Sequence, residues 1–447
     1  MIASPDVVLA RVRAAPLWLH AAIVFTALRF VSWLLLEQAA LQQEWTPGVT
    51  GPREGEIDLA LNWDAVWYQR IVNGGYPDEL PVGEDGRVQQ NPWAFYPVFP
   101  YLVRLVMALT GGDFAAVAPK VALLAGLGAA VVMAYLFRDT LAGRAACYQP
   151  LEVLPSPQEG RLVLLTAGNK ADAGATRLAL AGVAVWGAWP VSPVLQMAYT
   201  ESLSMLLLVS TLYLLVKQQW WWAAAGAVAL GLTRPIALPL LVVVIVCLVL
   251  RWRERRSRPI DSWESAGLAG LLTATGLSGV LWLSIAWAGT GRRDAYPSTM
   301  EAWRGEAAIN PIEPWKRTVE WAWTTHEQMW VLTALGMLVP LALSLILLIP
   351  GVAPGVDVRL RVWCAAYATY LLAVVDGHTS IFRYLVPLFP LALVLVGAHR
   401  GWRSPFSRWW GLRTTFWVAV GVCGQVWWIW WLVLYNPPAG QYGDWPP

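Results

Sequence analysis

The sequence predicts an all-α, polytopic membrane protein that forms a single domain over residues 1–447. Hydrophobic residues make up 57% of the chain and charged residues 14%, and the mean hydropathy is +0.48. A soluble domain carries about 25% charged residues, so this composition excludes that class. The 30 Trp residues fit a membrane protein, because an indole ring favours the membrane–water interface, where its N–H stays hydrated.

Other bulk features exclude several classes of site. The four cysteines are scattered and show no CxxC or His/Cys spacing, so neither a disulfide framework nor a zinc site is expected. The net charge of +3 is small and dispersed, so nucleic acid is not an expected partner.

About eleven apolar runs are long enough to cross a membrane, alone or packed in a bundle. The first run lacks a signal-peptide cleavage pattern and is predicted to remain as an anchor. The predicted spans are 16–40, 115–137, 177–196, 201–217, 221–234, 236–250, 266–288, 328–350, 362–376, 382–398 and 414–435.

The loop charges predict an orientation. Basic clusters before the first span and at 138–177, 251–258, 359–361 and 400–413 all lie inside if the N-terminus is inside and the C-terminus outside. The chain must then cross the membrane an odd number of times between residues 41 and 138. The run 94–111 is therefore expected to be an interfacial or re-entrant helix on the outer surface. Two long external loops then follow: 41–93, with nine acidic and three basic residues, and 289–327.

Several polar and charged side chains collect at the predicted outer face. They are Asp64 in the first external loop, Glu201 and Arg234 at turns between spans, and Asp376, His378 and Arg383 around a third turn. Ionisable groups at membrane depth are costly and usually face a partner or a functional cavity. Arg104 and Lys120 are less favourably placed.

Each of these residues also has a structural interpretation. Asp64 would cap a helix running from Ala65 to Val72, because Asp is a good N-cap. Glu201 would be the acid at the N-terminus of its own span, favoured by the helix dipole. Arg234 would pair with a neighbouring acid, Arg383 would be a snorkelling anchor, and His378 a hydrogen-bonded loop residue.

An ordered set of short motifs resembles the PIG-V-type mannosyltransferases, the family of the second GPI mannosyltransferase and its bacterial relatives. The motifs are Trp63-Asp64 with Tyr68 and Gly75-Tyr76, then Phe95 to Pro100, Ser192-Pro193, Tyr199 to Leu203, and Thr233-Arg234-Pro235. The resemblance is clearest over about 60–240. It departs from the usual acid pair of such enzymes, because the neighbour of Asp64 is Trp63.

The resemblance implies a GT-C-like helical bundle whose external loops carry juxtamembrane helices. It implies a glycosyltransferase that uses polyprenyl-phosphate-mannose, with an essential Asp that maps onto Asp64. The acceptor would be a glycolipid, a glycan or a protein hydroxyl. Only four of the 32 basic residues are Lys, which is typical of GC-rich bacterial genes. Together with the predicted spans and orientation, this indicates a multi-pass protein of a bacterial plasma membrane with its active site on the external side.

These expectations assign roles to individual residues. Asp64 is expected to be the general base of an inverting transfer. Arg234 and Arg383, with His378, are expected to bind the donor phosphate, because a guanidinium fork matches phosphate oxygens. With these donors no metal is required. The residues expected to contact the sugar or the acceptor are Trp63, Trp67, Tyr68, Tyr96, Glu201 and Asp376.

The alternative is a lipid-linked-sugar flippase or transporter without transferase activity. A transporter would predict inverted repeats and ionisable groups near the bilayer midplane. No repeat is visible in the sequence, and the polar residues gather at one face, which favours the enzyme.

Overall fold

The computed structural model describes residues 15–43, 59–147, 157–305, 311, 313–324, 328–375, 380–401 and 404–434. Over these residues the regular secondary structure is helical, and the only β pairing is an isolated bridge between Val82 and Val88. The predicted all-α class is therefore confirmed.

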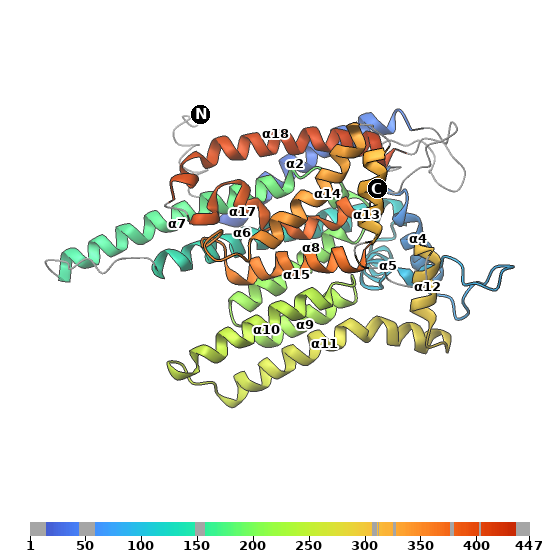
Figure 1. The fold of residues 1–447 in the computed structure, drawn as a ribbon, viewed down its shortest axis with the longest axis horizontal. Helices are drawn as coiled ribbons and strands as arrows, with labels where there is room; N and C mark the ends of the chain where they lie inside the picture. The colour runs from blue at the N-terminus through green and yellow to red at the C-terminus, as the bar shows by residue number, and fades with distance from the viewer. Residues whose placement is uncertain are drawn as a thin grey trace.

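The longer helices lie side by side, as Figure 1 shows, and α4, α5 and α12 gather at one end of the bundle, at the right of the view. At the left of the view lie the end of α6 and the start of α7, and likewise the end of α10 and the start of α11. The helices are α2 (Leu17–Ala40), α4 (Asp64–Gly74), α5 (Val98–Thr110), α6 (Phe114–Cys147), α7 (Pro157–Gly187), α8 (Glu201–Val216), α9 (Trp220–Gly231), α10 (Ala237–Arg253), α11 (Ser262–Thr290), α12 (Ala295–Arg304), α13 (Glu313–Thr324), α14 (Gln328–Ile346), α15 (Val358–Val374), α16 (Ile381–Tyr384), α17 (Leu391–Leu395) and α18 (Trp410–Trp428).

Four helices of the described chain are long and apolar enough to cross a membrane. They are Leu17–Ala40, Phe114–Gly143, Ser262–Thr290 and Pro405–Val433. Other predicted spans are shorter helices, such as α8 with 16 residues. At 1.5 Å per residue α8 is roughly 24 Å long, against roughly 30 Å for the hydrocarbon core. The apolar helices thus agree with a membrane protein, whereas the number of about eleven crossings stays a prediction.

The predicted span 382–398 is wrong as a single helix. The chain there divides into α16, a turn at Val386–Leu388, α17 and a turn at Ala398–Arg400. Pro387 and Pro390 explain the breaks, because proline has no N–H for the helical ladder. The predicted span 177–196 is broken as well, since α7 ends at Gly187 and is followed by the turn η2 (Ser192–Gln196).

The run 94–111 forms a turn at Pro92–Ala94 followed by α5. The 13 residues of α5 span roughly 20 Å, which is less than the hydrocarbon thickness. Its interfacial or re-entrant placement is consistent with this length and stays a prediction. The predicted external loops contain the short helices α4, α12 and α13.

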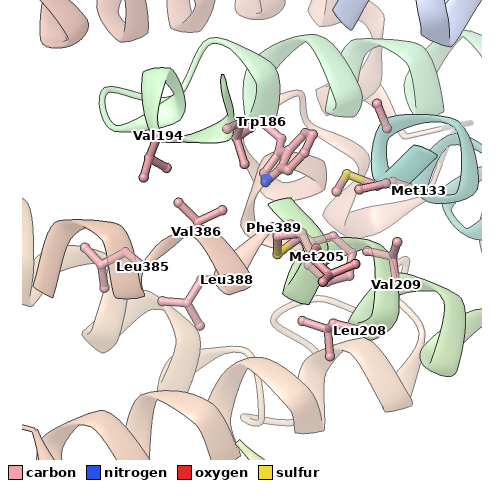
Figure 2. Close-up of a cluster of buried hydrophobic side chains, with 14 of the residues drawn as sticks. Met133, Trp186, Val194, Met205, Leu208, Val209, Leu385, Val386, Leu388 and Phe389 are labelled. Carbon is pink, nitrogen blue, oxygen red and sulfur yellow. The ribbon is translucent and has the colours of Figure 1, made fainter. Parts of the chain in front are cut away.

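Both broken segments contribute side chains to the same cluster of buried apolar residues. In Figure 2, Val194 of η2 and Val386 and Phe389 of the second broken segment lie near Trp186 of α7 and Met205 of α8. All five side chains are buried. Because interiors are close-packed, burial in this cluster restricts where the irregular backbone can lie.

The two ends of α8 differ in charge. Glu201 begins the helix, whereas Lys217 follows its last turn and forms an ion pair with Asp139 at 2.6 Å. Near that second end, Nη1 of Arg359 donates to the carbonyl oxygen of Leu215 at 3.1 Å. Lys217 and Arg359 thus lie one helix length away from Glu201, and each is paired with an acid there.

Candidate functional site

Four charged side chains from distant parts of the chain meet at one point. Nη1 of Arg383 lies 2.7 Å from Oδ2 of Asp64 and 3.1 Å from Oε1 of Glu201. Nη1 of Arg234 lies 2.9 Å from the same Glu201 oxygen. The side chains come from the starts of α4 and α8, the turn between α9 and α10, and α16. The sequence-predicted acid and both arginines are thus brought together.

The members of this cluster differ in exposure. The side chains of Arg383 and Glu201 are each 3% exposed, that of Arg234 is 13% exposed and that of Asp64 is 25% exposed. The second carboxylate oxygen of Asp64 makes no hydrogen bond within the part of the chain that the structure describes. Two carboxylates and two guanidinium groups cancel in charge, and Asp64 is the member that a substrate can reach most easily.

The backbone before Asp64 is unusual. Trp63 has a φ of 58°, a region that a residue with a side chain rarely adopts. Such a conformation costs of order 1–3 kcal/mol and persists only where the surroundings enforce it. Its indole N–H donates to the carbonyl oxygen of Val433 at 3.3 Å, and the amide of Ala65 donates to Asn62. The N-cap interpretation is wrong, because α4 begins at Asp64 itself and its carboxylate binds Arg383.

The segment before α8 holds the two acids in register. The amide of Ala198 donates to the carbonyl oxygen of Ala60 at 2.9 Å, and the hydroxyl of Tyr199 donates to that of Asn62 at 3.0 Å. The hydroxyl of Tyr68 donates to that of Thr200 at 3.4 Å. Two motifs that are far apart in the sequence therefore lie side by side, and each one fixes the position of the other.

Two tyrosine rings complete the surroundings of the arginines. The guanidinium of Arg383 lies 5.0 Å from the ring centre of Tyr199 and 5.6 Å from that of Tyr384. The guanidinium of Arg234 lies 4.9 Å from Tyr384, on the same ring. Cation–π contacts of this kind stabilise a partly desolvated guanidinium. Tyr199 belongs to one of the sequence motifs and Tyr384 directly follows Arg383, and this closeness in sequence to Glu201 and Arg383 is the only sequence signal of their role.

The structural interpretations have different outcomes. Glu201 does begin its own helix, and Arg234 does pair with an acid, so both are confirmed. Arg383 is not a snorkelling anchor, because it is buried and ion-paired. Asp376 and His378 lie outside the described residues. Arg104 and Lys120 are exposed and take no part in the cluster.

The predicted sugar-binding aromatics pack against other protein groups. Trp67 stacks on Phe95 at 5.8 Å between ring centres, with Arg70 over its ring at 4.4 Å. Tyr68 is 6% exposed, and the hydroxyl of Tyr96 lies 3.3 Å from that of Tyr296. In these positions the rings pack against other protein groups, and their contact with a sugar stays a prediction. The same holds for Trp63, which is half-buried.

Glu201 forms ion pairs that the sequence analysis predicted only in part, and its predicted contact with a sugar stays a prediction. Its carboxylate is buried between two guanidinium groups, so it holds both arginines in place. Within the described ranges, no three His, Cys, Asp or Glu side chains gather as a metal-binding group. That the predicted reaction needs no metal remains a prediction.

The chain matches none of the protein-family models and none of the curated proteins compared with it. The resemblance to the PIG-V-type enzymes therefore depends on the short motifs, and the function has to be argued from the site.

Proposed function

We propose that this chain is a GT-C-type membrane glycosyltransferase that transfers a mannosyl unit from polyprenyl-phosphate-mannose to an acceptor hydroxyl. One observation carries the proposal: the accessible carboxylate of Asp64 contacts the guanidinium of Arg383. Glu201 binds this guanidinium and also that of Arg234, so two positive charges lie beside the base. A base beside fixed positive charge is what displacement of a phosphate by a hydroxyl requires.

Asp64 acts as the general base. The acceptor oxygen attacks the anomeric carbon, and the hydroxyl proton passes to the carboxylate as the new C–O bond forms. The bond from Oδ2 to Arg383 fixes the orientation of the carboxylate and leaves the other oxygen to accept this proton. The phosphate leaves from the opposite face of the sugar, so the configuration at the anomeric carbon inverts.

Arg234 is the better candidate for contact with the donor phosphate. Only its Nη1 is used, in the pair with Glu201, and the rest of its fork makes no hydrogen bond within the described chain. Guanidinium N–H groups bind phosphate oxygens in pairs. Arg383 is the more buried of the two and supplies a second positive charge, while holding Asp64.

The charges balance through the transfer. The donor is a phosphodiester with one negative charge, and Asp64 carries another. After transfer the phosphate monoester carries two negative charges and Asp64 has become neutral. The site therefore needs no additional counter-ion when the phosphate leaves, and the two guanidinium groups stabilise the charge where it develops.

We propose that the site faces the external side of a bacterial plasma membrane, since the basic residues around Lys217 and Arg359 lie at the other end of α8. The donor lipid would lie between the helices, and the acceptor would be a glycolipid, a glycan or a protein hydroxyl.

The experiment compares native membranes containing the wild-type chain, Asp64→Asn and the control Asp85→Asn. Asp85 is an exposed acid on the hairpin between α4 and α5. Radiolabelled polyprenyl-phosphate-mannose is added, and both released polyprenyl phosphate and labelled acceptor are measured. We expect Asp64→Asn to lose about 10²–10⁴-fold in transfer, the range of a general base, and Asp85→Asn to keep it.

No transfer by the wild-type chain would refute the function. Near-normal transfer by Asp64→Asn would remove Asp64 as the base. Movement of the labelled lipid across the bilayer without transfer would support the flippase instead.

A further inference from the structure

A second polar centre lies in the bundle, in a helix to which the sequence motifs give no role. Arg29 stands near the middle of α2, one of the helices long and apolar enough to cross a membrane. It is 3% exposed, and none of its partners in the described chain is an acid. An arginine at such depth is costly, and it persists where it has a specific task.

Arg29 binds the chain where α7 ends. Its Nη1 donates to the carbonyl oxygen of Ser192, and its Nη2 donates to the carbonyl oxygen of Gly187 and, at 2.8 Å, to the hydroxyl oxygen of Ser192. Gly187 is the last residue of α7, and Ser192 is the first of η2. A helix end leaves carbonyl groups without intrahelical partners. The planar fork of an arginine can satisfy several of them at once.

A glutamine from another helix binds the same break. Nε2 of Gln425 in α18 donates at 3.1 Å both to the carbonyl oxygen of Ala188 and to the hydroxyl oxygen of Ser192. Its Oε1 accepts from the hydroxyl of Ser32 in α2 at 2.7 Å. Gln425 and Ser32 are fully buried. Side chains from α2 and α18 therefore hold one irregular segment between α7 and α8.

The position of this segment determines where two parts of the candidate site lie. The hydroxyl of Ser202, in the first turn of α8, donates to the carbonyl oxygen of Leu195 in η2 at 2.7 Å. Directly after η2, Ala198 pairs with Ala60 at 2.9 Å, four residues before Asp64. A shift of η2 would thus move both the start of α8, with Glu201, and the chain that leads to Asp64.

We propose that Arg29 is a positioning residue that fixes the break between α7 and α8 and thereby keeps Glu201 and Asp64 in register with Arg383. The catalytic consequence rests on the proposed transferase function, whereas the positioning of the segment does not. Misplacement of a reacting group by about 1 Å costs on the order of 10²-fold in rate, so the effect on catalysis is measurable.

The experiment compares Arg29→Met and Arg29→Lys with the control Arg251→Met. Arg251 is 1% exposed and binds Glu264 and two carbonyl groups at the other end of the bundle. The first measurement is backbone hydrogen exchange over 196–203 and 59–64. We expect exchange there to be about tenfold faster in Arg29→Met, partly restored in Arg29→Lys and unchanged in Arg251→Met.

The second measurement is transfer kinetics per folded protein. We expect Arg29→Met to lower kcat by about 10–100-fold with KM for the donor within about threefold, since the turn between α9 and α10 holds Arg234 in addition to its pair with Glu201. Arg251→Met should leave both parameters unchanged. If Arg29→Met does not fold, Ser192→Ala and Gln425→Leu each remove some of the hydrogen bonds of the same centre and are measured in its place.

Unchanged exchange in the folded Arg29 variants would overturn the proposal. Faster exchange with unaltered kcat would overturn its catalytic part. Faster exchange in the Arg29 variants, together with no transferase activity of the wild-type chain under any condition, would separate the two proposals: the function would fail and the positioning would stand.

Discussion

The two carboxylates of the site should affect the fold very differently when each is neutralised. Glu201 is 3% exposed and accepts from two guanidinium groups, at 2.9 and 3.1 Å. Asp64 is 25% exposed and accepts from one, at 2.7 Å. The perturbations Glu201→Gln and Asp64→Asn keep the shape of each side chain and remove one negative charge.

The expected cost follows from what each change leaves behind. In Glu201→Gln, Arg234 loses the one carboxylate that it contacts in the described chain, and removal of one partner of a buried pair costs about 3–5 kcal/mol. In Asp64→Asn, Arg383 keeps Glu201, and the loss is that of a partly exposed pair, about 1 kcal/mol or less. The difference of at least about 2 kcal/mol corresponds to a factor of roughly 30 or more in the unfolding equilibrium.

The assay is reversible unfolding in mixed micelles by titration with a denaturing detergent. Glu79→Gln, an exposed acid of the same external loop, controls for the substitution itself. The double variant Glu201→Gln/Arg234→Met should be more stable than Glu201→Gln alone, because it removes the unpaired guanidinium. If Asp64→Asn destabilised the protein as much as Glu201→Gln, the assignment of Glu201 as the structural acid would be refuted.

The remaining predictions concern other parts of the same arrangement. Arg234→Met should raise KM for the lipid donor at least about tenfold while the free energy of unfolding changes little, because Glu201 keeps Arg383; an unchanged KM in steady-state transfer would argue against phosphate contact. Gly421→Ala should destabilise the fold by about 1–3 kcal/mol, because the new Cβ would lie 2.2 Å from a backbone oxygen of the turn after α7. At Gly411, in the same helix, a Cβ would meet no atom within 4 Å, so Gly411→Ala should be neutral in the same unfolding assay. Burial raises the pKa of the Tyr76 phenol. The contribution of the neutral phenol to stability is therefore present below pH about 10 and falls as the pH rises towards the folded pKa. Tyr76→Phe should reduce this loss of stability at alkaline pH, measured as the free energy of unfolding against pH.

The sequence by itself determined the class of the protein and most members of the candidate site. A chain with 57% hydrophobic residues must place its helices in an apolar environment, and charged residues in such surroundings are few enough to be noticed singly. Asp64, Glu201, Arg234 and Arg383 were selected on that ground, and they meet in the structure.

Only the tertiary structure decided how these residues pair and which of them are exposed. Arg383 and Asp64 are 319 positions apart, and no local pattern states which guanidinium meets which carboxylate. Hydropathy averages over a window, so it joined 382–398 into one span across two prolines and gave no weight to Arg29 inside an apolar run. Pairing and exposure depend on which helices pack together, and that is a property of the whole chain, because each buried charge is stable only where distant segments supply its partners.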